Sequence, residues 1–183
     1  MRIVVGITGS SGAVYAVDFL KKCPATKYLI VSTWGKVLLR DEAGLGEKDL
    51  APYVQRTFSD EDLTAPLASG SNHIDACVLL PASTSTIGKI ASGIGDTLIT
   101  RAAQVALKER FKLILCVRET PLSTITLDQC ARLSASGAVI MPISPPLYFV
   151  PASVDEYVAG FTSKVLQQLG MPTGKGWREE DLG

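Results

Sequence analysis

The stretch "RIVVGITGSSGAVYA", residues 2–16, passes from an apolar run through a glycine-rich turn into a helical pattern. Residues 2–7 are mostly Ile and Val, which is typical of a strand that is buried on both faces. Between residues 12 and 23, apolar residues recur three and four positions apart, as on one face of an amphipathic helix. A strand that leads directly into a helix predicts the first half of a βαβ unit.

The same alternation of strand and helix patterns continues to residue 170. Further apolar runs predict strands at residues 27–32, 75–81, 112–117 and 137–142. Helical periodicity predicts helices at residues 84–94, 97–111, 126–136 and 153–170. This alternation predicts an α/β fold of three layers, in which helices cover both faces of an open, mainly parallel sheet of the Rossmann or flavodoxin type. We expect residues 1–170 to form a single domain and residues 171–183 to form a C-terminal tail.

The composition argues against several classes of partner. The 183 residues include 18 basic and 18 acidic side chains, so nothing predicts binding to nucleic acid or to a membrane surface. No apolar run approaches the roughly 18 residues of a membrane-spanning helix, and the first residues turn glycine-rich too early for a signal peptide. The four cysteines are scattered and His73 is the only histidine. We therefore expect reduced thiols, a cytoplasmic location and no metal site.

The strand exits carry polar side chains, and ligands of open parallel sheets bind outside the carboxyl ends of the strands. The first exit is "TGSSG", residues 8–12. Its backbone N–H groups and two serines precede a helix, which suits an anion such as a phosphate. Its glycines fit neither GxGxxG nor GxxxxGK[ST], and a tight turn with a serine cap explains the segment equally well.

The exit of the strand at residues 75–81 carries four consecutive hydroxyl residues, 83–86. One hydroxyl suffices as a helix N-cap, so four in a row favour a second polar cradle. Because no lysine of the nucleoside triphosphatase type follows, the phosphate or ring edge of FMN fits better than ATP. The next helix carries Arg101 and Lys108 on one face, and a solvated stripe is the ordinary explanation of such a pair.

The stretch "KLILCVRETPLS", residues 112–123, runs an apolar strand into Arg118, Glu119 and then Pro121. Proline cannot continue the hydrogen-bonded ladder of a central strand, so the strand ends at this point. The adjacent charges are then either a solvated cap on the strand or chemical groups at the carboxyl edge of the sheet.

Several segments together resemble a known family. They are "GITGSSGAVYA", "PASTSTIGKIASG", "LITRAAQVALKER", "VRETPLS", "GAVIMP" and "PPLYFVPASVDE", and they extend from Arg2 to about Gly170. In this order they resemble the UbiX-type flavin prenyltransferases, long described as aromatic-acid decarboxylases, of the homo-oligomeric flavin-containing Cys decarboxylase superfamily. The combination of "LKER", "RETPLS" and a tyrosine six residues after "MP" is the most specific part of the resemblance.

The resemblance implies a set of functional residues. FMN would be bound by the positions that match Gly9, Ser10, Ser11, Ser32, Ser83, Thr84, Ser85, Thr86 and Arg101. The phosphate of a second substrate, dimethylallyl phosphate, would be held by the positions that match Lys108, Arg118, Tyr148 and Lys164. The expected catalytic residues are Ser11, Glu42, Glu119 and Tyr148.

The implied reaction transfers a dimethylallyl group to N5 and then C6 of reduced FMN, and the prenylated FMN would serve a partner UbiD-type decarboxylase. Arg118, Lys108 and Lys164 would stabilise the departing phosphate, so that no metal ion is needed. Glu119 would hold a proton for the leaving oxygen, and Glu42 would take the C6 proton. Family members assemble as trimers and dodecamers, which implies a homo-oligomer with active sites shared between subunits.

Two alternative functions remain open from the sequence. The first is an FMN-dependent decarboxylase of the same superfamily, although the "PxMN" motif of the cysteine decarboxylases is absent. The second is a non-catalytic subunit that binds and delivers flavin. The sequence also departs from the family pattern at Leu63, where some members have an aromatic residue, and at Phe149, where a histidine often follows the tyrosine. Trp177 in the tail is a candidate for docking on a neighbouring subunit.

Overall fold

The computed structural model describes residues 1–171, Arg178 and Asp181. In this part of the chain, strands and helices alternate as the sequence predicts. The strands are β1 (Arg2–Ile7), β2 (Thr26–Val31), β3 (Arg56–Ser59), β4 (Ala76–Ala82), β5 (Lys112–Val117) and β6 (Val139–Pro142). The α-helices are α1 (Ala13–Lys22), α2 (Thr33–Ala43), α3 (Thr84–Ala91), α4 (Leu98–Glu109), α5 (Thr124–Ala135) and α6 (Val154–Gln168). Two 3₁₀ helices are η1 (Glu47–Tyr53) and η2 (Pro66–Ala68).

The described strands form one sheet in the order β3-β2-β1-β4-β5-β6, and every neighbouring pair is parallel. The chain builds outward from β1 to β3 and then returns to the other side of β1 to begin β4. The loops after β1 and β4 therefore diverge, which creates the crevice in which such sheets bind ligands. The expected α/β fold is confirmed, and the sheet is wholly parallel in the described part of the chain.

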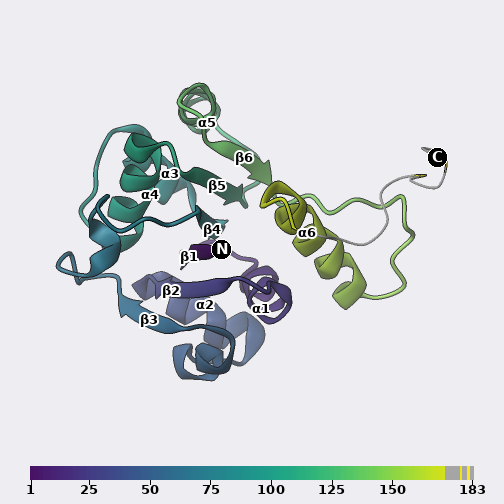
Figure 1. Cartoon of the computed structure of the whole chain (residues 1–183). Coiled ribbons are helices and arrows are strands. Elements are labelled where there is room, and N and C mark those ends of the chain that lie inside the picture. Colours follow the sequence, from purple (N-terminus) through teal and green to yellow (C-terminus); the bar gives the residue numbers. More distant parts are fainter. Residues whose placement is uncertain (172–177, 179–180, 182–183) are drawn as a thin grey trace.

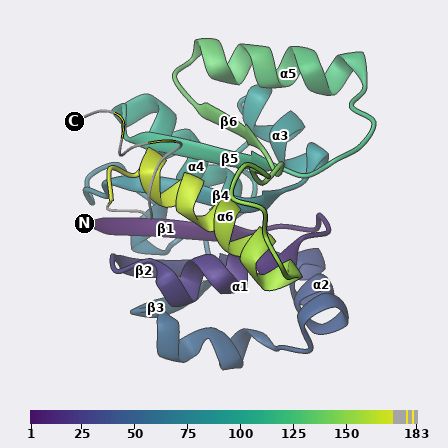
Figure 2. The same cartoon turned by 90° about the vertical axis from the view of Figure 1, so that its right-hand side faces the viewer.

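Helices cover both faces of the sheet (Figure 1). Helices α1, α2 and α6 lie on one face and share a core with side chains such as Phe19, Leu39 and Phe161. Helices α3, α4 and α5 lie on the other face and share a second core. The strands serve both cores because alternate side chains point to opposite faces: Val5 packs in the first core and Val4 in the second. The view in Figure 2 shows α6 lying across α1, with the long connection from β6 leading back to it.

Helix α2 and strand β3 were not predicted from the sequence. Within α2 only Gly35 and Leu39 are buried, and within the four residues of β3 only Phe58 is buried. Neither element therefore carries the apolar periodicity on which the prediction depended. Other boundaries differ by a few residues. The helix expected at 84–94 ends at Ala91, just before Gly93 adopts a left-handed backbone with φ 75°.

A close backbone approach fixes the start of α2. A methyl group on Gly35 would lie 2.5 Å from the carbonyl oxygen of Ile7, at the end of β1. The N–H of Ser32 donates to the same oxygen at 3.0 Å, and the Ser32 hydroxyl accepts from the Gly35 N–H at 3.0 Å. Glycine at position 35 thus allows α2 to begin directly beside the end of β1, with Ser32 as its N-cap.

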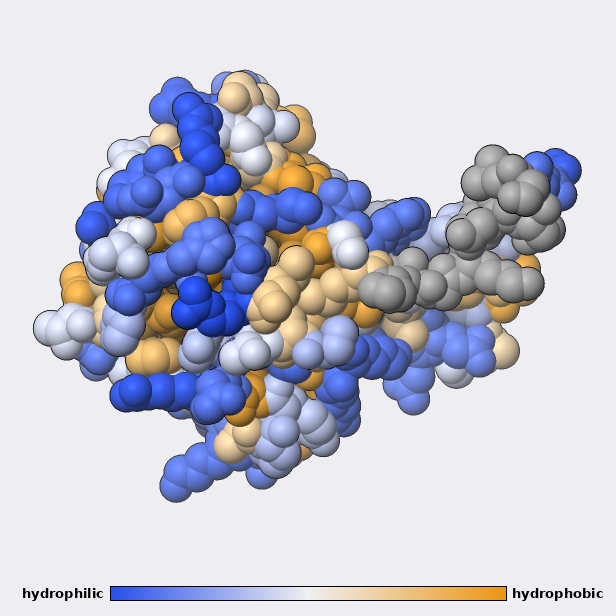
Figure 3. Space-filling model, in the orientation of Figure 1, coloured by the Kyte–Doolittle hydropathy of each residue, from blue (hydrophilic) through white to orange (hydrophobic). Residues whose placement is uncertain are grey.

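Among the described residues, the surface of the molecule shows no segregation of polar and apolar residues on the face in view. On the face shown in Figure 3, hydrophilic and hydrophobic residues are interspersed. In the described part of the chain, no helix is long and apolar enough to cross a bilayer. All four cysteines are free thiols, and among the described residues no group of three or more His, Cys, Asp or Glu side chains is arranged to hold a metal ion.

Candidate functional site

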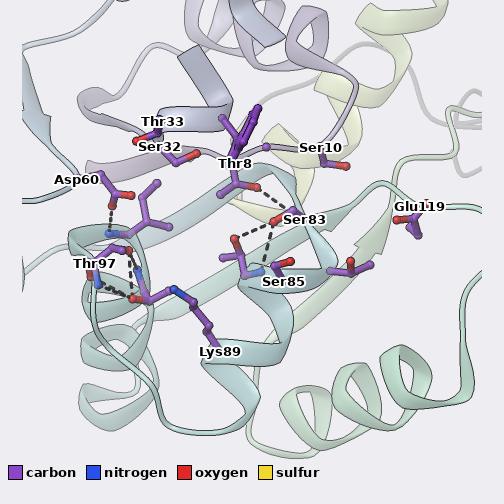
Figure 4. Close-up of a pocket in the computed structure, with 16 residues that line it drawn as sticks. Thr8, Ser10, Ser32, Thr33, Asp60, Ser83, Ser85, Lys89, Thr97 and Glu119 are labelled. Atoms are coloured by element: carbon purple, nitrogen blue, oxygen red, sulfur yellow. Dashed lines mark hydrogen bonds between the residues drawn. The ribbon is translucent and has the colours of Figure 1, made fainter. Parts of the chain in front are cut away.

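A cavity of about 510 Å³ lies at the carboxyl edge of the sheet (Figure 4). This volume is within the usual range for small-molecule sites. Its walls come from the exits of β1 to β5 and from the first turn of α4. The residues that line it are Thr8, Gly9, Ser10, Ser32, Thr33, Trp34, Asp60, Ser83, Thr84, Ser85, Thr86, Lys89, Thr97, Ile99, Thr100 and Glu119. Asp60 and Glu119 lie at opposite ends of the cavity.

Three helices begin at this cavity, and each has a hydroxyl side chain as its N-cap. The oxygens of Ser32, Ser83 and Thr97 accept hydrogen bonds from backbone N–H groups in the first turns of α2, α3 and α4. The partial positive charge at helix N-termini favours anions. Because the Ile99 N–H at the start of α4 already donates to Asp60, the starts of α2 and α3 are the ends that suit a phosphate or another electron-rich group.

Of the four hydroxyl residues 83–86 at the start of α3, two cap the helix and two do not. Ser83 and Thr86 bond to each other, with their oxygens 2.9 Å apart, and the Ser83 N–H donates to the Thr8 hydroxyl at 2.8 Å. They therefore act as a cap, as the simpler interpretation proposed. In the described part of the chain, the hydroxyls of Thr84 and Ser85 make no hydrogen bond, yet both residues line the cavity. These two hydroxyls are available to a ligand.

The start of α1 is occupied by a carboxylate from another part of the chain, as the start of α4 is by the carboxylate of Asp60. Its N-cap, Gly12, has no side chain and a φ of 114°. The Glu42 carboxylate, on α2, accepts hydrogen bonds from the N–H groups of Gly12 at 2.7 Å and Ala13 at 2.9 Å. The expectation that the N–H groups of residues 9–12 are free for a phosphate is therefore wrong for Gly12 and also for Ser10, whose N–H donates to the Thr8 carbonyl at 2.9 Å.

These contacts set the protonation of Glu42. Burial raises its pKa, but the hydrogen bonds from the Gly12 N–H, the Ser11 hydroxyl and the Ala13 N–H lower it, as does the positive charge of Arg118. The net effect is a pKa below the ordinary value for glutamate. Glu42 is consequently an ionised hydrogen-bond acceptor near neutral pH, and it holds Ser11 beside the cavity.

Arg118 and Glu119 follow β5 directly, as the sequence predicts. The Ser10 hydroxyl donates to the Arg118 carbonyl at 2.5 Å, which ties the exit of β5 to the exit of β1. The Glu119 carboxylate accepts from the Thr120 N–H at 3.0 Å and lines the cavity. Among the described residues these two side chains form no ion pair with each other, so each is available for another partner.

Most of the residues expected to bind the cofactor come together in this cavity, and the exceptions are Ser11 and Arg101. Arg101 lies on α4, where its Nε donates to the Ala68 carbonyl at 3.0 Å. Lys108, two turns further along α4, pairs with Glu109 beside Gly70.

The remaining residues expected to bind the second substrate also lie outside the cavity of their own chain. Tyr148 lies in the connection between β6 and α6. Lys164 lies on α6 itself, where its Nζ donates to the Gln167 side chain at 3.1 Å. Together with Arg101 and Lys108, these residues are displaced from the cavity that holds the expected cofactor ligands.

Sequence reasoning missed a group of residues at the β3 end of the cavity. Asp60 accepts a hydrogen bond from the Ile99 N–H at 2.8 Å; burial raises its pKa, against this bond and the one from the Thr97 hydroxyl. Lys89 lines the cavity and pairs with Asp96 at 2.7 Å. The exit of β3 would have indicated Asp60, but that strand was itself missed.

Comparison with known proteins gives the family. The family model described as Flavoprotein matches residues 1–165. A protein described as flavin prenyltransferase UbiX of Thermoplasma acidophilum is 45% identical over 172 residues, which cover 93% of this chain and 96% of the relative. The chain belongs to the Flavoprotein family, as a UbiX-type flavin prenyltransferase. Flavin prenyltransferase LpdB of Lactiplantibacillus plantarum is 43% identical over 169 residues, with 90% of each chain covered.

Solved structures of other members share the whole fold. The dodecameric FMN-dependent UbiX-like decarboxylase from Escherichia coli O157:H7 matches with a TM-score of 0.93 and 34% identity, over 97% of this chain and all of that chain. The structure of AnUbiX (PadA1) in complex with FMN and dimethylallyl pyrophosphate matches with a TM-score of 0.91 and 31% identity, over 97% of this chain and 98% of that chain.

The cavity fits FMN on its own chemistry. The unpaired hydroxyls of Thr84 and Ser85 and the starts of α2 and α3 suit the phosphate and the polar ribityl chain. Trp34 and Ile99 are the large apolar side chains among the residues that line the cavity, and they offer contact to a flat ring system.

We predict that Glu42→Gln lowers the free energy of unfolding by about 1 kcal/mol near neutral pH, because the charged acceptor at the start of α1 is lost. Since the folded pKa of Glu42 is depressed, its contribution is complete above the pKa of the unfolded state and is lost as the pH falls through the folded pKa. The difference between wild type and variant should therefore shrink below about pH 4 in urea titrations. The exposed Glu61, changed to Gln, is the control. A difference that does not change with pH would contradict the assignment.

Proposed function

We propose that this protein transfers a dimethylallyl group from dimethylallyl phosphate to N5 and C6 of reduced FMN. The observation that carries the proposal is the cavity at the switch point of the sheet, where helix N-termini and free hydroxyls adjoin Glu119. The relatives from Thermoplasma acidophilum and Lactiplantibacillus plantarum are described as flavin prenyltransferases, and one related structure holds both FMN and dimethylallyl pyrophosphate. When bound, reduced FMN supplies the nucleophilic ring atoms that accept the dimethylallyl group.

In this proposal the cofactor residues orient FMN and exclude water. Gly9, Ser10 and Ser32 meet the flavin from the exits of β1 and β2, together with Ser11 beside them. Residues 83–86 meet it from the exit of β4. The positions of these residues are fixed by strand ends and helix caps rather than by free loops, which holds the reacting atoms in one geometry.

The leaving phosphate requires positive charge and a proton. Arg118 lies at the exit of β5, and its planar guanidinium can hold two phosphate oxygens at once. Glu119, next to it in the cavity wall, holds the proton for the leaving oxygen. Tyr148 donates a hydrogen bond to the same phosphate, and Lys108 and Lys164 add charge.

Glu42 accepts the proton released from C6. The depressed pKa keeps its carboxylate ionised, and the Ser11 hydroxyl donates to it, so Ser11 holds the base in place. A carboxylate whose pKa is depressed is a weak base, which suits a proton that leaves readily because its departure restores an aromatic ring.

The site is shared between copies of the chain in an assembly built from trimers, as a dodecamer. Arg101, Lys108, Tyr148 and Lys164 do not line the cavity of their own chain, although the family resemblance assigns them to FMN and substrate. A neighbouring copy can present these residues to the cavity. The related protein from Escherichia coli O157:H7 is dodecameric.

The product, prenylated FMN, would be released to a UbiD-type decarboxylase, and four free thiols suit the reducing cytoplasm as the place of reaction. A decarboxylase activity of this chain is the second candidate, because the related Escherichia coli protein is described as an FMN-dependent UbiX-like decarboxylase. A carrier that only delivers flavin has no use for the second group of phosphate-binding residues.

We predict that Glu119→Gln slows prenylation by about 10²–10⁴-fold, the usual effect of losing a general acid. The variant keeps the size of the side chain, so FMN affinity and the free energy of unfolding should stay at wild-type values. Glu61→Gln, which alters an exposed carboxylate that does not line the cavity, should prenylate FMN at the wild-type rate. Wild-type turnover in Glu119→Gln would show that the residue is only a solvated cap on β5.

We predict that Arg101→Ala weakens FMN binding by about 1.5–3 kcal/mol, because a charge-assisted bond to the flavin is lost. If Arg101 acts on a neighbour's cavity, mixed assemblies of Arg101→Ala and Glu119→Gln chains will contain some sites with both residues intact. Mixing the two impaired variants under conditions that exchange subunits, at an FMN concentration that does not saturate Arg101→Ala, should then raise activity above that of either variant alone. Mixtures whose activity is only the average of the separate variants would mean that both residues serve the same chain's cavity.

A further inference from the structure

The connection between β6 and α6 contains a short turn, residues 147–150, which we call the 147–150 turn. Prolines 145, 146 and 151 flank it. Inside it the Val150 N–H donates to the Leu147 carbonyl at 2.9 Å, and Val150 has a φ of 51°. A β-branched residue rarely adopts a left-handed backbone, so contacts made elsewhere must hold the turn in this shape. Leu147 and Val150 do not supply them, because 66% and 82% of their surfaces are exposed.

Phe149 supplies such a contact. Its ring lies against Gly160, in the second turn of α6. A methyl group on Gly160 would lie 2.8 Å from Cε1 of the ring and still closer to Cζ, so the ring occupies the space that any other residue at position 160 would fill. Glycine inside a helix is unfavourable for the helix itself, and here it provides the notch that receives the ring.

The same contact orients Tyr148. The Tyr148 and Phe149 rings stack edge to face, with centroids 5.8 Å apart and an interplanar angle of 90°. Lys164 follows Gly160 by four residues on α6, so the notch and the lysine lie on the same face of the helix. Docking of Phe149 on Gly160 thus holds the ring against which Tyr148 packs on the helix face that carries Lys164.

We propose that Phe149 and Gly160 are positioning residues, which act through Tyr148 to set the affinity for the phosphate of dimethylallyl phosphate. The inference rests on the proposed function, because it takes Tyr148 and Lys164 as ligands of that phosphate. The proposal also assigns a role to Phe149, which by the family resemblance stands where a histidine often follows the tyrosine. The sequence alone does not indicate this role. Histidine is polar and smaller, and it would fill the Gly160 notch less completely.

A double-mutant cycle tests the contact, with Phe149→Ala, Gly160→Ala and the two combined. Each single change should raise the KM for dimethylallyl phosphate about tenfold and leave the Kd for FMN unchanged. Hydrogen exchange of the Val150 amide should accelerate in both. In the combined variant, Gly160→Ala should add nothing to KM or to exchange, since the ring that it displaces is already gone. Val154→Ala, which shortens an exposed side chain at the start of α6, is the control and should match wild type.

The melting temperature of the variants tests the contact independently of activity. Alanine is the better helix former, so Gly160→Ala should raise the Tm in the Phe149→Ala background. In the wild-type background it should lower the Tm, because the ring is expelled. A change of Tm with the same sign in both backgrounds, or additive effects on exchange, would overturn the contact.

The failures of the two proposals are distinguishable. If exchange and Tm show the coupling but KM does not respond, Phe149 and Gly160 hold only the turn, and the inference about substrate is overturned. If wild type forms no prenylated flavin while the coupling in exchange persists, the proposed function fails, and the role of these residues toward substrate fails with it.

Discussion

The parallel pairing of all described strands is the constraint on which the site depends. Because the strands run the same way, each of them ends at the same edge, and the helices that directly follow a strand begin there. N–H groups at the starts of α2 and α3 therefore converge on one cavity without any special sequence motif. The reversal of build direction between β1 and β4 opens the crevice in which these groups are exposed.

The start of α1 shows how the protein separates binding from proton chemistry. At α1 the Glu42 carboxylate takes the place that an anion would otherwise occupy, and this contact keeps it ionised. The starts of α2 and α3 thus stay open to the cavity, whereas those of α1 and α4 are filled by Glu42 and Asp60. Flavin and carboxylate can then lie close together without competing for the same N–H groups. The expected cationic ligands Arg101 and Lys108 on α4 and Lys164 on α6 lie outside this cavity. A neighbouring copy of the chain can present them to it.

The parts of the fold that repeat a local pattern were predictable from the sequence. Some features are unbroken runs in the sequence, such as the strands at residues 2–7 and 112–117 and the hydroxyl residues 83–86. Their positions in the sheet and at its edge follow from the α/β alternation. Strand β3 and Asp60 were missed, because a four-residue strand with one buried side chain carries no periodic pattern. The contact between Glu42 and Gly12 joins residues 30 positions apart, so only the packing of α2 beside α1 reveals it. Trp177 lies outside the described residues, and its proposed docking stays a prediction.

The mass of the flavin after reaction tests the central claim most directly. The purified protein would be incubated with reduced FMN and dimethylallyl phosphate in the absence of oxygen, and the released flavin weighed by mass spectrometry. Transfer to N5 and C6 predicts a flavin heavier than FMN by one five-carbon dimethylallyl unit, together with one inorganic phosphate released for each flavin modified. Flavin recovered at the mass of FMN, with dimethylallyl phosphate unconsumed, would contradict the account and leave binding or decarboxylation as the function of the cavity.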